Sequence, residues 1–327
     1  QSSRGRFFMI NTRKIGIIGA GHVGSHCAFS LILQGVCDDI TFVDVNKEKA
    51  VSQAFDCMDT LAFLPHRAVI KSGEIKDLGD KDIIIICVGT IDNISKDRLC
   101  ELDHSLKIIK SFIPEIMKTG FNGYFIVITN PVDIITYYVQ QLSGLPYNKV
   151  IGTGTGLDSA RLRRILSVET EIDARSIQAY MLGEHGDSQV AAFSCATVNG
   201  KLLPELIAEK PEKFSKIDFE AIEKKTTETG WDILCGKGST EFGIACTCTE
   251  VVKAIFHDEK KVMPCSAFLQ GEYGTFDIYA GVPAVIGKEG IEYIIELPLN
   301  EREKKKLSNT FDIIKHHVEI GRESVKN

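Results

Sequence analysis

The segment GAGHVG at residues 19–24 constrains the fold of this chain more than any other feature of its sequence. It directly follows a short apolar run, Lys14–Ile18, and leads into a helical pattern. Glycines at positions 19, 21 and 24 allow a tight turn, a close approach of backbone to a ligand, and packing of the helix on a sheet. The helix N-terminus then faces an anion such as a pyrophosphate. This order of strand, loop and helix predicts a nucleotide-binding α/β fold.

An acidic residue completes the pattern. Asp44 ends the next apolar run, Ile40–Val43, twenty residues after Gly24. A carboxylate there accepts hydrogen bonds from both ribose hydroxyls and would repel the 2′-phosphate of NADP. We therefore predict NAD as the cofactor; the alternatives are glycine turns in an unrelated α/β domain or a methyltransferase loop. The predicted cofactor-binding residues of this region are Gly19, Gly21, His22, Val23, Gly24 and Asp44.

Apolar runs alternate with amphipathic stretches through the first half of the chain. The runs are continuous, which is typical of strands buried on both faces of a parallel sheet: Ile15–Ile18, Ile40–Val43, Asp82–Val88 and Tyr124–Thr129. Between them, apolar residues recur at helical spacing, most clearly in Asp97–Lys118. We predict an α/β fold with a Rossmann-type, doubly wound parallel sheet in an NAD-binding domain at residues 10–151.

The pattern becomes mixed in the second half, and a length of 327 residues fits about two domains. We expect a mixed α+β substrate domain at residues 152–327. Its expected elements are a strand at Ser176–Leu182, a charged helix near Phe219–Lys225, a helix over Thr240–Phe256, short strands with glycine turns over Pro264–Gly287, and a helix from Asn300.

Composition excludes several classes of partner. The net charge is −6, so no basic excess exists to bind nucleic acid. The longest apolar run, Ile83–Val88, is too short to cross a membrane. Ten scattered cysteines form no CxxC pair, which indicates reduced thiols and a cytoplasmic protein. We predict no metal; a structural zinc site is the weaker alternative.

Two charged residues share an apolar helix face in the segment Leu157–Val168. On a helical wheel, Asp158 and Arg161 lie on the same side as Leu162 and Ile165, whereas Arg163 points away. Charges on an apolar face are costly unless they are paired. The simpler interpretation is an ion pair between Asp158 and Arg161. The sharper one gives each a different partner: a histidine for the aspartate and a ligand carboxylate for the arginine.

A histidine is available for this role. His185 follows an expected strand in the glycine-bounded turn GEHGD at residues 183–187. A histidine in such a turn is more often a surface or capping residue than a catalyst. The presence of Asp158, which could orient the imidazole, favours a catalytic role.

Five motifs in this order resemble the NAD-dependent L-lactate/L-malate dehydrogenase family over essentially the whole chain after Met9. They are Gly19–Gly24, Asp44, Thr129–Asp133, Leu157–Arg161 and Gly183–Asp187. The resemblance is greatest to the L-lactate and L-2-hydroxyisocaproate dehydrogenase branches. It implies an oxidoreductase that acts on a small 2-oxo or 2-hydroxy acid, with lactate and pyruvate as the first expectation. It also implies a homotetramer or a dimer.

The resemblance implies roles for the four catalytic candidates. His185 would act as the acid–base, and Asp158 would hold its tautomer and stabilise the imidazolium. Arg161 would clamp the substrate carboxylate. Arg98 would polarise the substrate carbonyl after a loop closes.

Four further residues complete the implied site. Asn130 would bind the substrate or the nicotinamide side of the cofactor, and Gly89 would contact the cofactor. Thr240 would form a wall of the substrate pocket. Asp92 would face the variable end of the substrate, where a carboxylate disfavours a second substrate carboxylate such as that of oxaloacetate. An Asp92 that simply faces solvent is the alternative.

Other functions stay open at this point. A dehydrogenase of bulkier 2-oxo acids of the L-2-hydroxyisocaproate type comes next, and a malate dehydrogenase is third. An NAD-dependent glycoside hydrolase would need a metal held by Cys and His, and it would leave Asp158, Arg161 and His185 unexplained. A non-catalytic NAD-binding protein would need none of these three residues.

Overall fold

The computed structural model describes residues 12–89, 98–214 and 216–326. Within them, one sheet of nine strands dominates the molecule. Its strands lie in the spatial order β3 (Val69–Ser72), β2 (Asp39–Val43), β1 (Lys14–Ile18), β4 (Ile83–Ile86), β5 (Tyr124–Val127), β6 (Val150–Gly152), β12 (Lys261–Gln270), β13 (Phe276–Gly287) and β14 (Gly290–Ile294). The first six strands are parallel, in the order 3-2-1-4-5-6 of a Rossmann-type sheet, which confirms the predicted fold class.

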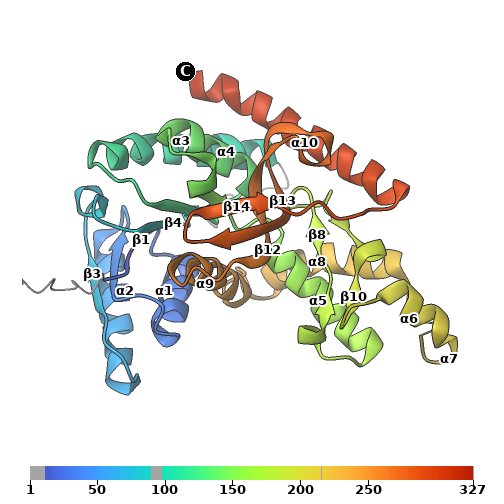
Figure 1. The fold of residues 1–327 in the computed structure, drawn as a ribbon. Coiled ribbons are helices and arrows are strands. Elements are labelled where there is room, and N and C mark those ends of the chain that lie inside the picture. Colours follow the sequence, from blue (N-terminus) through green and yellow to red (C-terminus); the bar gives the residue numbers. More distant parts are fainter. Residues whose placement is uncertain (1–11, 90–97, 215, 327) are drawn as a thin grey trace, which may run out of the picture.

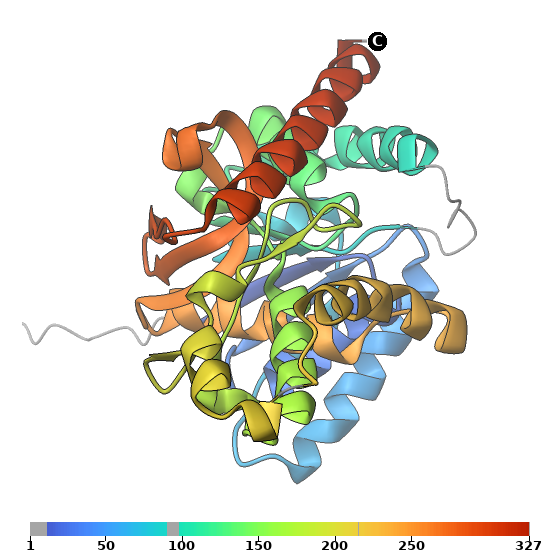
Figure 2. The same cartoon turned by 90° about the vertical axis from the view of Figure 1, so that its right-hand side faces the viewer.

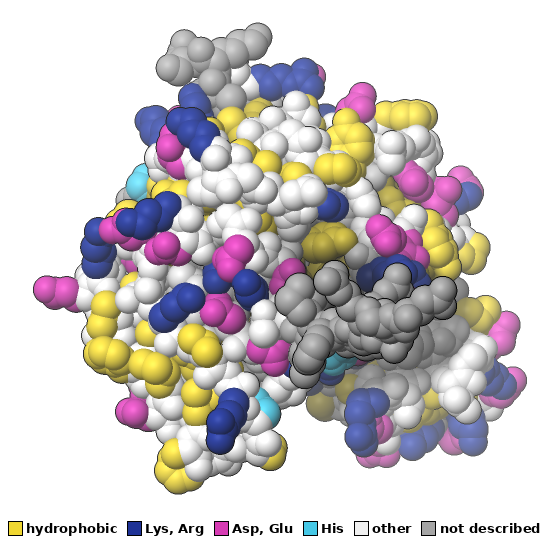
Figure 3. Space-filling model, turned by 60° about the vertical axis from the view of Figure 1, so that its left-hand side comes forward, with side chains coloured by type: hydrophobic (Ala, Val, Ile, Leu, Met, Phe, Trp, Pro, Cys, Tyr) yellow, Lys and Arg dark blue, Asp and Glu magenta, His cyan; other side chains and the backbone are white. Residues whose placement is uncertain are grey.

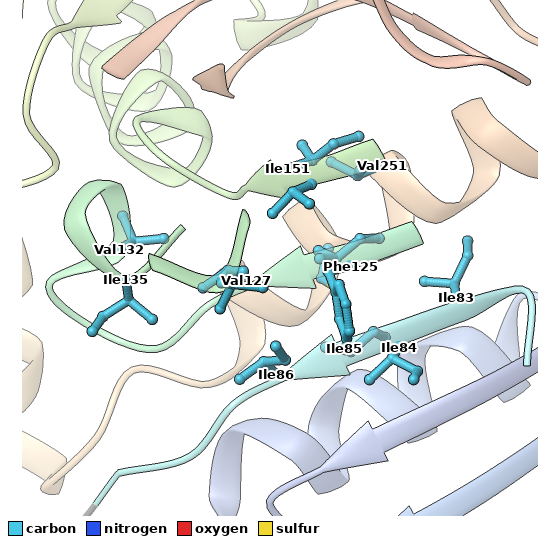
Figure 4. Close-up of a cluster of buried hydrophobic side chains, with 14 of the residues drawn as sticks. Ile83, Ile84, Ile85, Ile86, Phe125, Val127, Val132, Ile135, Ile151 and Val251 are labelled. Carbon is cyan, nitrogen blue, oxygen red and sulfur yellow. The ribbon is translucent and has the colours of Figure 1, made fainter. Parts of the chain in front are cut away.

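Helices cover both faces of this sheet (Figure 1). On one face lie α1 (His22–Leu33), α2 (Lys47–Thr60) and α9 (Phe242–Phe256); on the other lie α3 (Arg98–Lys118), α4 (Val132–Ser143) and α10 (Glu301–Lys326). The central strands are therefore buried on both sides, which explains their unbroken apolar sequence. All four isoleucines of β4 are fully buried and lie beside Phe125 and Val127 of β5 (Figure 4).

The remaining elements surround a second, smaller core. They are α5 (Gly156–Thr170), α6 (Leu203–Glu209), α7 (Pro211–Phe214), α8 (Phe219–Lys237), and the short strands β7 (Ile177–Gln178), β8 (Met181–Leu182), β9 (Val190–Ala191), β10 (Thr197–Val198) and β11 (Lys201–Leu202). Leu162 and Leu166 of α5 pack there against Ile222 of α8. Figure 2 shows α5 and α8 side by side.

The expected strand at Ser176–Leu182 is wrong. The chain changes partners within it: β7 pairs with β10 in one small sheet, and β8 pairs with β9 in another. The charged helix expected near Phe219–Lys225 is longer than its charge pattern suggested, because α8 continues to Lys237.

The short strands expected over Pro264–Gly287 are also wrong, because β12 and β13 form one long antiparallel hairpin. Gly281, which suggested a turn, lies inside β13. A Cβ atom there would come within 2.5 Å of the Thr155 hydroxyl oxygen and 2.9 Å of the Gly183 carbonyl oxygen. The glycine thus permits a close approach of other chain segments to the strand and does not end it.

The register of the parallel strands brings their carboxyl ends into one row. Ile18 pairs with both Val43 and Ile86, and Val127 pairs with Ile86 and Gly152. The segments that follow these strands therefore leave the sheet at the same edge, where open α/β sheets bind ligands.

The surface shown in Figure 3 carries acidic and basic side chains intermingled. Among the described residues, no helix has the length and apolar content needed to span a membrane.

Candidate active site

The loop between β1 and α1 has a shape that only glycine allows. Gly19 has φ +100°, and a Cβ atom there would lie 2.4 Å from the Cys87 carbonyl oxygen. A Cβ at Gly24 would lie 1.9 Å from the Gly19 carbonyl oxygen. Above Gly21, by contrast, the space is open except for the Lys49 ammonium nitrogen, 3.9 Å from the Cβ position. The loop is therefore packed on its inner side and accessible on its outer side.

Asp44 lies directly beside this loop. Its Oδ2 accepts a hydrogen bond from the Ala20 backbone N–H at 2.7 Å, and its Oδ1 accepts one from Asn46 N–H at 2.8 Å. These bonds fix the carboxylate at the end of β2, and each oxygen keeps a further lone pair for a ribose hydroxyl. The glycine loop and Asp44 together fit the pyrophosphate and ribose of a dinucleotide.

Lys49 was missed by the sequence analysis. Within the described chain its ammonium group makes no ion pair, whereas Lys47, on the same helix, pairs with Glu74 at 2.8 Å. The position of Lys49 over Gly21 places a cation where a pyrophosphate would lie. No local signal could have shown this, since a lysine on an exposed helix face is common.

Other predicted cofactor residues lie around the loop. His22 begins α1, and its Nδ1 is 3.3 Å from Oε1 of the buried Glu241. Glu241 follows Thr240 in the linker between α8 and α9, so this linker lies beside the dinucleotide loop. Val23 packs against the main core. Gly89 is exposed after β4, and a Cβ there would meet nothing within 4 Å.

The three charged residues singled out in the second half lie together. Asp158 is fully buried in the first turn of α5. Its Oδ2 lies 2.6 Å from Nδ1 of His185, and its Oδ1 accepts a hydrogen bond from Nη1 of Arg161 at 2.9 Å. Asp158 therefore makes both of the expected contacts, the ion pair with Arg161 and the contact with His185. The Nε of Arg161 is buried and has no hydrogen-bond partner within the described residues.

These contacts set the protonation of the pair. Burial alone would lower the pKa of His185, but the charge of Asp158 and its hydrogen bond outweigh burial and raise it above the ordinary value. Burial alone would raise the pKa of Asp158, but His185 and Arg161 outweigh it and lower that pKa. The site thus favours an imidazolium beside a carboxylate.

A second buried carboxylate holds the turn that carries His185. Asp133 of α4 accepts the His185 backbone N–H at 2.8 Å and the Ser266 hydroxyl at 2.6 Å. Burial raises the pKa of Asp133 to about 6. Gly183 also pairs with Gly281 through two backbone hydrogen bonds of 2.7 and 2.8 Å. The turn is therefore tied to α4, β12 and β13.

Asp133 was quoted in a motif but given no role. A signal for it existed, since it is a lone acid within the apolar run Val132–Ile135. Its partners lie 52 and 133 residues away, where no local pattern reaches.

Of the remaining predicted residues, Asn130 lies after the carboxyl end of β5, and Arg98 and Asp92 lie partly or wholly outside the described part. Asn130 is exposed between β5 and α4, with a cis peptide to Pro131, and its carbonyl accepts the Ser105 hydroxyl at 2.9 Å. Arg98 is the first residue of α3, and its side chain lies outside the described part. Asp92 lies wholly outside it.

Nine of the ten cysteines are free thiols, and the side chain of the tenth, Cys100, lies outside the described part. No cluster of His, Cys, Asp or Glu within the described ranges is arranged to hold a metal ion.

Known family models match both halves of the chain. Residues 13–152 match the lactate/malate dehydrogenase NAD binding domain. Residues 155–325 match the alpha/beta C-terminal domain of the same enzymes.

Similar proteins cover nearly the whole chain. An L-lactate dehydrogenase of Fusobacterium nucleatum is 55% identical over 314 residues, which are 96% of this chain and 98% of that protein. L-lactate dehydrogenase 3 of Bacillus cereus is 45% identical over 308 residues, 94% of this chain and 98% of its own length. The ligand-bound minor L-lactate dehydrogenase of Enterococcus mundtii has a TM-score of 0.91 at 37% identity, covering 94% of this chain and 98% of that one. Since both halves and the full length agree, the chain belongs to the NAD-dependent lactate/malate dehydrogenase family.

Proposed function

We propose that this protein is an L-lactate dehydrogenase, which interconverts pyruvate and L-lactate with NADH and NAD. The observation that carries the proposal is the contact of Asp158 with both His185 and Arg161 in one buried cluster. It supplies a proton donor and a carboxylate-binding cation side by side. The names of the 55% and 45% identical relatives favour lactate over other 2-hydroxy acids.

His185 is the proposed acid–base. Because Nδ1 faces the Asp158 carboxylate, Nδ1 carries a proton and Nε2 is the outward nitrogen. In pyruvate reduction, Nε2–H donates its proton to the ketone oxygen, and in lactate oxidation Nε2 accepts it back. Asp158 stabilises the imidazolium form before the proton leaves.

Arg161 is the proposed partner of the substrate carboxylate. Asp158 occupies its Nη1, and the other side of the guanidinium keeps donors for a ligand. Arg98 polarises the ketone, Asn130 and Thr240 line the substrate, and Asp92 faces its variable end in this proposal.

The glycine loop and Asp44 hold the dinucleotide, with Lys49 near its phosphates. Gly89, His22 and Val23 complete the proposed cofactor contacts. Bound NADH supplies the hydride. The chain itself orients the two reactants and controls the proton at His185.

We further propose a cytoplasmic homo-oligomer, a homotetramer or a dimer, with a functional division between residues 10–151 and 152–327. Large apolar side chains exposed on the neighbouring helices α1 and α2, such as Phe29, Leu33 and Phe55, support self-association. Light scattering after size-exclusion chromatography measures the mass.

The deciding experiment compares kcat/KM for NADH oxidation with pyruvate, 2-oxoisocaproate and oxaloacetate. We expect pyruvate to lead. A lead for 2-oxoisocaproate would favour a dehydrogenase of bulkier acids, and a lead for oxaloacetate would reject the argument from Asp92.

A matched variant separates an enzyme from a binding protein. His185→Asn should abolish turnover and leave NADH affinity unchanged, because His185 lies outside the dinucleotide loop. A wild-type protein that binds NADH but reduces none of the three acids would refute the proposed function.

A further inference from the structure

Asp133 of α4 is a buried acid that forms no ion pair with a lysine or an arginine of the described chain. It is 1% exposed, and the two donors that bond its carboxylate are a hydroxyl and a backbone N–H, both uncharged. Burying a carboxylate without a cation in contact is costly. A reason for an acid at this position must therefore lie in what its charge does for a neighbour.

The hydrogen bonds of Asp133 do not themselves require a charge. Its Oδ2 accepts the His185 backbone N–H at 2.8 Å, and its Oδ1 accepts the Ser266 hydroxyl at 2.6 Å. Because a hydroxyl can accept as well as donate, an asparagine could accept from His185 N–H through its oxygen and donate to Ser266 through its amide nitrogen. An uncharged side chain of the same shape would therefore hold the turn as well.

The charge instead acts on the imidazole of His185. The Asp133 carboxylate bonds the backbone of the residue whose ring contacts Asp158, so acids from two helices, α4 and α5, meet at one histidine. Burial lowers the pKa of His185, and the charge and hydrogen bond of Asp158 outweigh burial. The charge of Asp133 raises this pKa further, whereas the charge of Arg161 lowers it.

Asp133 is itself ionised at neutral and alkaline pH. Burial raises its pKa to about 6, while the bonds from Ser266 and His185 and the charge of His185 limit the rise. Within the described residues, Glu184 is the other charged group that acts on Asp133, and it raises the same pKa. Above about pH 6, the carboxylate is therefore charged, and the imidazolium of His185 is the cation that compensates it.

We infer that Asp133 is a positioning residue that holds the proton on His185 by its negative charge, in addition to holding the turn by its hydrogen bonds. A proton held more firmly leaves His185 at higher pH, and both directions of the reaction depend on this proton. The charge of Asp133 thus moves the working range of the site upward in pH. The inference rests on the proposed acid–base function of His185.

The test compares Asp133→Asn with a matched control, Glu303→Gln. Glu303 of α10 is also a buried acid whose two oxygens accept a backbone N–H and a serine hydroxyl, both from Ser194. Asp133→Asn should keep or raise the melting temperature, because it removes a buried charge and keeps the hydrogen bonds. Glu303→Gln should leave the pH dependence of turnover unchanged, whatever it does to stability.

The readout is kcat/KM from pH 6.5 to pH 9 in both directions. Pyruvate reduction falls as pH rises through the pKa of His185, and lactate oxidation rises. In Asp133→Asn both limbs should move to lower pH, so that kcat/KM falls about threefold for pyruvate at pH 9 and rises about threefold for L-lactate at pH 6.5. The gain at pH 6.5 is decisive, because a loosened turn would lower turnover at every pH.

A binding measurement makes the test independent of turnover. NADH titration counts the folded sites, and the affinity of oxamate, a planar amide analogue of pyruvate, is then measured per site against pH. The oxamate carbonyl accepts the proton at Nε2 of His185, so its affinity should fall at lower pH in Asp133→Asn than in the wild type.

Three outcomes would overturn the inference. They are unmoved limbs and an unmoved oxamate profile in Asp133→Asn, an equal movement in Glu303→Gln, and an Asp133→Asn chain that does not fold, since the fold would then need the carboxylate for another reason. A wild type that turns over neither pyruvate nor lactate would instead count against the proposed function.

Discussion

Asp158 is the residue on which the charges of the site depend. It is fully buried and contacts two cationic groups, His185 and Arg161, with its two oxygens. A buried carboxylate with one partner removed leaves an uncompensated charge, which is strongly destabilising. Both cations therefore support the charged form of Asp158. Asp158 supports the charged form of His185, whereas the charge of Arg161 opposes it.

A pH profile tests this dependence. Asp158 raises the pKa of His185 against the opposing effect of burial, so Asp158→Asn should lower that pKa. Pyruvate reduction needs protonated His185 and falls as pH rises through its pKa, so in the variant this limb should move to lower pH. At pH 8 we expect kcat/KM to fall about 10²- to 10⁴-fold.

The measurement is kcat/KM for pyruvate from pH 5 to pH 9. Asp173→Asn is the control, because Asp173 is an exposed acid whose side chain accepts hydrogen bonds from Arg175, away from His185. An unchanged limb in Asp158→Asn would contradict the assignment of His185. Stability follows the same linkage: the gain from charged His185 is full below the unfolded pKa of about 6.5 and is lost as pH rises through the raised folded pKa.

The sequence predicted those site residues that form a pattern with residues close to them in the sequence. Asp158 and Arg161 were found because charges on an apolar helix face stand out within three residues of each other. Asp133 contacts Ser266 of β12 and the backbone of His185, and such contacts exist only after folding. The predicted roles of Arg98 and Asp92 stay predictions.

Among the elements, α10 has an unexpected link to the turn that carries His185. The Glu184 backbone N–H donates to the Thr310 hydroxyl at 3.1 Å, and the hydroxyls of Thr310 and Ser188 lie 2.5 Å apart. Ser188 donates in turn to the Glu184 carboxylate at 2.5 Å. These hydrogen bonds join Glu184 and Ser188, and His185 lies between these two residues in the sequence.

Removing one hydroxyl should loosen the turn. Thr310→Val keeps the shape of the side chain but leaves the buried Glu184 N–H without an acceptor, at a cost of about 1–3 kcal/mol in the free energy of unfolding. We expect kcat for pyruvate reduction to fall about tenfold as His185 loses its position. Urea unfolding and steady-state kinetics measure the two effects.

Two further variants separate the effect on kcat from the effect on stability. Thr310→Ser restores the hydroxyl and should restore kcat. Thr170→Val removes an equally buried hydroxyl that bonds only to the Leu166 carbonyl, so it should lower stability without lowering kcat. A Thr310→Val enzyme with wild-type kcat would show that α10 does not position the turn.

The elements themselves were predicted unevenly. The strands β1, β2, β4 and β5 were recognisable as continuous apolar runs because they are buried on both faces. The edge strand β3 is partly exposed and lacks such a run. The hairpin of β12 and β13 was misread because its glycines, such as Gly281, resemble turn residues. Inside the sheet, Gly281 makes room for Thr155, and Pro283 lies opposite Pro264 across the hairpin.

The molecule as a whole is joined by one sheet that crosses from the first half of the chain to the second. Ser266 of β12 pairs with Gly152 of β6, so residues from the C-terminal match cover the edge of the N-terminal sheet. Without β12, the edge of β6 would have unpaired backbone groups. We therefore expect the two halves to unfold together.

Hydrogen exchange measured by mass spectrometry checks this expectation. Backbone amides of β5 and of β12 should exchange with opening free energies within about 1 kcal/mol of each other. The short helices α6 and α7, outside the large sheet, should exchange earlier. Earlier exchange of the whole β12–β13 hairpin would show that the halves open independently.

The composition of helix α8 has a separate consequence. Trp231 is the single tryptophan of the chain and lies on α8. It follows Gly230, where a Cβ atom would lie 3.3 Å from Nη1 of Arg161. All tryptophan fluorescence of the chain therefore comes from this one position on α8. That emission overlaps the absorption band of reduced nicotinamide, so Trp231 can act as an energy-transfer donor. Each chain thus carries one intrinsic optical probe, and energy transfer from it can report cofactor binding without any label.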